Sequence, residues 1–183
     1  WIWNGVAWRR VDHATSPALG NMASAYDSDR RRVVVFGGAD QTASNTVWEL
    51  VDNRWRATIA NPQQPWPAPT SSTKLVYDAG RRETILVGAS PNQGTWAWNG
   101  SGWRNPTDVS HSPFPELATL VGHAMAYGNG QVVLVAGYGS KNETWTWDGT
   151  TWTHHALATK PPTRSHHAMA FDPIRGRIVL VGG

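Results

Sequence analysis

The chain has 183 residues, of which 40% are hydrophobic and 16% charged, and a formal net charge of +3. It contains no apolar run near the ~18 residues that a membrane-spanning helix needs, so no membrane span is expected. Its 18 glycines and 12 prolines indicate a loop-rich domain, and the absence of cysteine leaves the redox compartment open.

Eleven of the 12 tryptophans belong to a block that occurs four times. Each block begins and ends with a tryptophan, as in Trp1 to Trp8, Trp48 to Trp55, Trp96 to Trp103 and Trp145 to Trp152. The first tryptophan recurs after 47, 48 and 49 residues. A period in this range is typical of propeller blades, so the chain is predicted to be a repeat protein.

Each tryptophan block is predicted to form a β-hairpin. Residues alternate between the tryptophans and then reach Asn4-Gly5, Asn99-Gly100 or Asp148-Gly149. These dipeptides favour the positive φ values of a type I′ turn. The second copy has Val51-Asp52-Asn53 instead, and a longer loop is expected there.

A second block follows each tryptophan block. It starts near an aromatic residue and ends in a β-branched run closed by small residues: Tyr26 with 33–38, Tyr77 with 85–89, Tyr127 with 132–137, and Phe171 with 178–183. Apolar runs of this length suit buried inner strands. The aromatic residue and the last strand residue are separated by 12, 12, 10 and 12 residues, which predicts a second hairpin of nearly constant length.

The two blocks together form one extended motif. Its clearest copies are His166-His167-Ala168-Met169-Ala170-Phe171-Asp172 through Gly183, and Thr144 through Trp152. This motif resembles the Kelch repeat in its bacterial, tryptophan-rich form, and the resemblance covers essentially the whole chain. It implies an all-β propeller with four antiparallel strands per blade, similar to the central propeller of galactose oxidase. The second copy departs most, with Thr73 in place of His and Gly88-Ala89 in place of Gly-Gly.

One domain over residues 1–183 is predicted, with repeats near 1–45, 46–94, 95–143 and 144–183. The chain begins with a tryptophan hairpin and ends with the other kind, so three blades are complete and the fourth is divided between the ends. We expect Trp1 to Trp8 to pair with a strand equivalent to 178–181. Three arrangements stay open: a closed four-bladed ring, a piece of a larger ring, and half of an eight-bladed ring made by two chains.

A binding surface is expected on the side of the long connections that lead from one blade to the next. These connections vary in length, and function concentrates in variable loops on rigid scaffolds. Two aromatic residues there stand outside the repeated pattern, Trp66 and Tyr138. They are the candidate binding residues for a protein or glycan partner. The alternative for Trp66 is that it covers the blade below its loop, and the other tryptophans are expected to pack between blades.

No metal or cofactor site is predicted. His123 and His167 share one repeat position, which indicates a structural role, and His154, His155 and His166 have no Cys or suitably spaced carboxylate near them. A copper site of the galactose oxidase type is excluded because it requires a Cys. Arginines cluster in one kind of hairpin turn, as in Arg30 to Arg32, where solvated charge is the default, so nucleic acid is not an expected partner.

These patterns favour a non-catalytic binding or scaffold module, because no general acid and base pair or nucleophile motif is present. The alternative is the propeller portion of a larger secreted carbohydrate-active enzyme. The resemblance to exported bacterial Kelch proteins implies an extracellular or periplasmic location.

Overall fold

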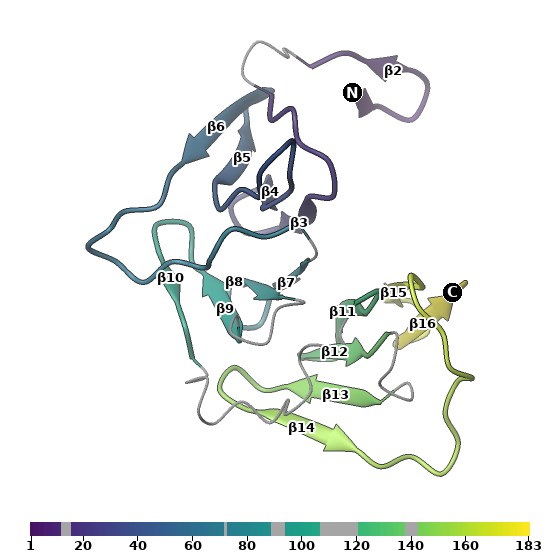
Figure 1. The fold of residues 1–183 in the computed structure, drawn as a ribbon. Coiled ribbons are helices and arrows are strands. Elements are labelled where there is room, and N and C mark those ends of the chain that lie inside the picture. The colour runs from purple at the N-terminus through teal and green to yellow at the C-terminus, as the bar shows by residue number, and fades with distance from the viewer. Residues whose placement is uncertain (12–15, 72, 89–93, 107–120, 138–142) are drawn as a thin grey trace.

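The protein is described by a computed structural model that places residues 1–11, 16–71, 73–88, 94–106, 121–137 and 143–183 (Figure 1). These residues form sixteen strands and no helix. The strands are β1 (Ile2–Trp3), β2 (Trp8–Arg9), β3 (Ala23–Asp27), β4 (Arg32–Phe36), β5 (Val47–Val51), β6 (Arg54–Thr58), β7 (Lys74–Asp78), β8 (Glu83–Val87), β9 (Thr95–Trp98), β10 (Trp103–Arg104), β11 (Ala124–Gly128), β12 (Gln131–Val135), β13 (Thr144–Trp147), β14 (Trp152–His155), β15 (Ala168–Asp172) and β16 (Arg177–Val181).

The strands form three four-stranded antiparallel sheets, each in chain order. We name them sheet 1 (β3–β6), sheet 2 (β7–β10) and sheet 3 (β11–β14). The two remaining pairs are the N-terminal hairpin (β1–β2) and the C-terminal hairpin (β15–β16). The predicted all-β class and the alternation of two kinds of hairpin are therefore confirmed. Closure of these sheets into a ring is not seen.

The turns of the tryptophan hairpins differ from the prediction. The Asn-Gly and Asp-Gly copies form four-residue loops, because Trp98 pairs with Trp103 and Trp147 pairs with Trp152. In each loop the Asn or Asp side chain accepts two backbone N–H bonds, as Asp148 Oδ1 does from Thr150 (2.9 Å) and Thr151 (2.7 Å). These N–H groups lower the pKa of Asp148.

The longer loop expected at Asp52-Asn53 is also wrong. Val51 pairs directly with Arg54, and both turn residues have positive φ (49° and 62°). This is the two-residue turn that the other copies were expected to have. The side-chain hydrogen bonds of the Asn or Asp explain why the other copies lack this turn. They hold a four-residue loop in which only the glycine has a positive φ.

The turn of the other kind of hairpin contains an Asp–Arg ion pair in three of its four copies. Asp27 Oδ1 accepts the Arg30 backbone N–H (2.8 Å), and its Oδ2 contacts the guanidinium (2.6 Å). The pairs Asp78–Arg81 and Asp172–Arg175 repeat this arrangement. The third copy replaces the loop by the two-residue turn Asn129-Gly130, which accounts for its shorter spacing. Arg30 and Arg81 are thus paired with carboxylates, whereas the sequence favoured solvated charge.

The core lies between successive sheets. One cluster joins Val34 and Phe36 of sheet 1 to Trp98 and Trp103 of sheet 2. A second joins sheets 2 and 3: Ile85, Val87, Ala97, Val132, Leu134, Ala136, Trp147 and Trp152. At both boundaries the later sheet contributes two tryptophans, and the earlier sheet contributes the apolar side chains that they cover. The predicted packing role of these four tryptophans is confirmed.

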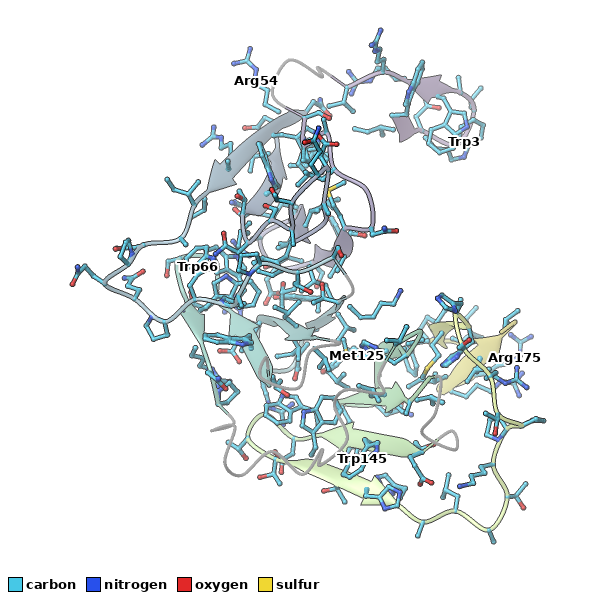
Figure 2. All side chains as sticks on the ribbon, viewed as in Figure 1. Trp3, Arg54, Trp66, Met125, Trp145 and Arg175 are labelled. Atoms are coloured by element: carbon cyan, nitrogen blue, oxygen red, sulfur yellow. The ribbon has the colours of Figure 1, made fainter. Side chains whose placement is uncertain are left out.

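The two terminal hairpins do not pair with each other in this structure. The N-terminal hairpin pairs with no other described strand, and Trp1, Trp3 and Trp8 are exposed. Figure 1 shows the hairpin apart from the sheets, and Figure 2 labels Trp3 on it. The expectation that these three tryptophans are packed between blades does not hold here. Their equivalents in sheets 2 and 3 owe their burial to the adjoining strand and to the preceding sheet, and the N-terminal hairpin has neither.

Trp147→Ala should lower the free energy of unfolding by ~3–5 kcal/mol, because it truncates a fully buried aromatic side chain between two sheets. Urea unfolding followed by circular dichroism measures this loss. Ile59→Ala is the control, since Ile59 is exposed and its truncation should change stability by less than about 0.5 kcal/mol. Equal effects of the two substitutions would contradict the packing described here.

Candidate functional site

The candidate site is the side of the molecule that carries two sets of connections, which we call the loop face. One set joins the second and third strands of a sheet, and the other joins the fourth strand to the next sheet. In an antiparallel meander both sets lie at the same end of the strands, opposite the short turns. Two of these connections, 37–46 and 59–73, lie against each other, and the structure describes residues 37–46 and 59–71 of them.

Hydrogen bonds hold these two connections together. The Gly38 N–H donates to Thr70 O (2.8 Å), and the Thr70 N–H donates to Ser44 O (3.0 Å). Gly37 has a positive φ of 73°, and a Cβ there would lie 2.5 Å from Thr70 O. Only glycine permits this approach. Gly37 and Gly38, which follow β4, thus let the connection 59–71 lie directly across the end of that strand.

Trp66 lies in this pair of connections. Its indole N–H donates to Asn45 O (2.7 Å), and its ring meets the Trp98 ring edge-on at a centroid distance of 5.9 Å. Figure 2 labels Trp66. The side chain is half-buried, so it covers sheet 2 and still presents part of its surface to solvent. Its role in binding stays a prediction. Tyr138 lies outside the described residues.

The repeat position of His123 and His167 is buried. Both residues are at most 5% exposed, and Thr73 occupies the same position in the second copy and is equally buried. This arrangement supports their expected structural role. Burial lowers the pKa of His167, so the folded state favours the neutral ring.

A charged cluster on the loop face was not found from the sequence. Glu143 Oε2 contacts His154 Nε2, and its Oε1 contacts Lys160 Nζ (3.1 Å). The His154 bond, followed by Lys160, holds the pKa of Glu143 below its ordinary value. The His154 ring lies on Trp145 at a centroid distance of 4.6 Å. One feature of the sequence could have indicated this cluster. The tryptophan hairpin pairs Trp145 with His154, and Glu143 lies only two residues before Trp145.

A cavity of about 610 Å³ lies among the first strands of the four repeats. Its lining comes from β3, β7, β11 and β15 and includes Tyr26, Tyr77, Tyr127 and Phe171. No charged side chain lines it. The cavity therefore lies where the first strands of the four repeats come together.

The Glu143 cluster offers one carboxylate, one imidazole and one ammonium group beside the Trp145 indole, a combination that suits hydrogen bonds and stacking. Within the part of the chain that the structure describes, no three His, Cys, Asp or Glu side chains are placed to hold a metal ion. That part also contains no helix long and apolar enough to cross a membrane.

Acidification should destabilise the protein through His167. The unfolded ring takes up a proton near pH 6.5, whereas the buried ring does so only at lower pH because its pKa is lowered. The contribution of the neutral His167 ring to the free energy of unfolding is therefore fully present above about pH 6.5, and it falls as the pH drops below that value. His167→Gln should reduce the fall in melting temperature between pH 7.5 and 5.5. His166→Gln is the control because His166 is exposed; an unchanged fall in His167→Gln would contradict this role.

Comparison of the sequence with protein-family models gave no match, and comparison with curated proteins gave none either.

Proposed function

We propose that the chain is a Kelch-like β-propeller domain that acts as a non-catalytic binding module, with its loop face as the contact surface for a protein or glycan partner. The repeated motif and three meandering four-stranded sheets support the propeller. The tryptophan-rich Kelch resemblance supports an exported, bacterial protein.

The observation that carries the binding role is the mutual anchoring of the loops. Three hydrogen bonds join the connection 59–71 to the connection 37–46, including the bond from Trp66 to Asn45 O. A surface ordered before binding loses less conformational entropy on contact. The scaffold below is equally ordered, since both core clusters lie between the sheets that these loops join.

The side chains on this face suit a polar ligand with a flat or apolar side. Glu143, His154 and Lys160 present an acceptor and donors within one group beside the ring of Trp145, and the half-buried Trp66 provides a separate ring surface on the connection 59–71. Sugars and peptides both combine hydrogen-bonding groups with apolar faces, and they are the two ligand classes that we propose.

Binding is tested by probing arrays of immobilised oligosaccharides and peptides with the labelled 183-residue chain. Glu143→Gln combined with Lys160→Ala should weaken binding to the recognised probe by at least ~10-fold, because it removes charged contacts from the loop face. Asp52→Asn combined with Arg54→Ala is the control: it also leaves the net charge unchanged, and both residues are exposed at a turn on the opposite side. Absence of binding, or loss in the control variant alone, would overturn the proposal.

A further inference from the structure

The cavity among the first strands has a lining unlike that of the loop face. Each repeat contributes one aromatic residue to it: Tyr26, Tyr77, Tyr127 and Phe171. Met125, labelled in Figure 2, and Met169 add two thioethers. The volume of about 610 Å³ falls within the ~300–1,000 Å³ of small-molecule sites. The cavity is therefore large enough for one small molecule.

Three of the four aromatic side chains are held against the turn of the preceding repeat. The Tyr77 hydroxyl donates to Asp29 (2.9 Å), in the turn between β3 and β4. The Tyr127 hydroxyl lies beside Gly80, where a Cβ would be 2.8 Å from it, and the Phe171 ring covers Gly128. These contacts fix the wall of the cavity before a ligand binds. An ordered wall loses less conformational entropy on binding.

Small side chains keep the space between the rings open. The residue before the aromatic residue lines the cavity in every repeat, and it is Ala25, Val76, Ala126 or Ala170. A phenylalanine at one of these positions would occupy part of the space itself. Protein interiors seldom leave a void larger than a water molecule. The repeated combination of a large ring and a small neighbour therefore leaves ring surface available to a ligand.

The cavity opens to solvent beside Tyr26. This residue lines the cavity and is 57% exposed, whereas Tyr77 at the same repeat position is 8% exposed. Tyr26 and Ser28, which also lines the cavity, lie at the end of β3 that leads into the short turn. The opening is therefore on the side of the short turns, opposite the loop face. A ligand could enter it without displacing the long connections.

Apolar and polar groups are separated along the cavity. Leu75, Met125 and Met169 precede the aromatic residues of their strands by two positions. They lie farther from the short turns by ~6.6 Å, since a strand rises ~3.3 Å per residue. The hydroxyl-bearing Tyr26 and Ser28 lie near the turn end. This arrangement suits a ligand with an apolar body and one polar end.

The charges around the cavity favour a neutral ligand. None of the lining residues that the structure describes is charged. Asp29, in the adjoining turn, already accepts hydrogen bonds from Tyr77 and from Arg82 Nε (2.7 Å). Asp27 and Asp78 bind arginines of their own turns. A cation would find ring faces but no carboxylate without a partner, and a buried charge needs one.

We infer that this cavity is a binding site for a neutral aromatic small molecule. The flat ring system lies between the tyrosine and phenylalanine side chains, and its hydroxyl or carbonyl group lies at the opening beside Tyr26 and Ser28. The two methionines contact the inner edge of the ligand, because thioethers pack well on aromatic rings and adapt to irregular shapes. This site is separate from the loop face and does not depend on the function proposed for that face.

The probe for this site is 2-naphthol, a neutral molecule with two fused rings and one hydroxyl. Isothermal titration calorimetry with the 183-residue chain should show saturable binding of one molecule per chain. Ala170→Phe should weaken this binding by at least ~10-fold, because the added ring fills part of the cavity. Ala168→Phe is the matched control. Ala168 is also an exposed alanine on the same side of β15, but it does not line the cavity, so the affinity should stay unchanged.

Tyr26→Ala gives a second measurement on a side chain whose exposure makes loss of the fold unexpected. It should weaken binding by at least ~5-fold, since it removes one ring from the wall. Circular dichroism melting curves check that the variants fold. Absence of saturable binding, or equal losses in Ala170→Phe and Ala168→Phe, would overturn the inference.

Two further outcomes would also contradict the site. Naphthol bound only to exposed tryptophans such as Trp1, Trp3 and Trp8 would keep its affinity in both cavity variants. Saturable binding of tetramethylammonium in place of 2-naphthol would show that the rings select a cation instead of a neutral molecule.

Discussion

The structure depends on the stacking of one sheet on the next. The four-stranded sheets carry apolar side chains on their faces, so each is stabilised by the neighbours that cover those faces. Trp98 and Trp103 cover Phe36 and Val34, and Trp147 and Trp152 cover Ile85 and Val87 in the same manner. Because each tryptophan face needs an aliphatic face before it, the repeats can be ordered in only one direction. The order of the sheets in turn fixes the positions of the loops that join them.

The polar groups at the sheet boundaries help to determine the order and register in which the sheets stack. The Arg30 guanidinium binds Asp27 and Glu49 and lies where a Cβ of Gly100 would be, so that glycine meets both a positive φ and a close contact. Glu49 also accepts the Trp98 indole. A buried charge without such partners costs several kcal/mol. A sheet placed in the wrong order or register would leave these groups unpaired, so that arrangement would be less stable.

The strands and their order could be predicted because they follow from local pattern, in alternation, β-branched runs and spacing. The burial of Trp147 followed from its place in the repeat. The turn types could not be predicted, since the Asp148 side chain competes with the backbone preference of Asp-Gly. The Glu143 cluster and the ion pair of Arg30 with Glu49 were missed because they join residues of different elements, and the sequence does not state how those elements are aligned. Exposure of Trp3 depends on what adjoins its hairpin.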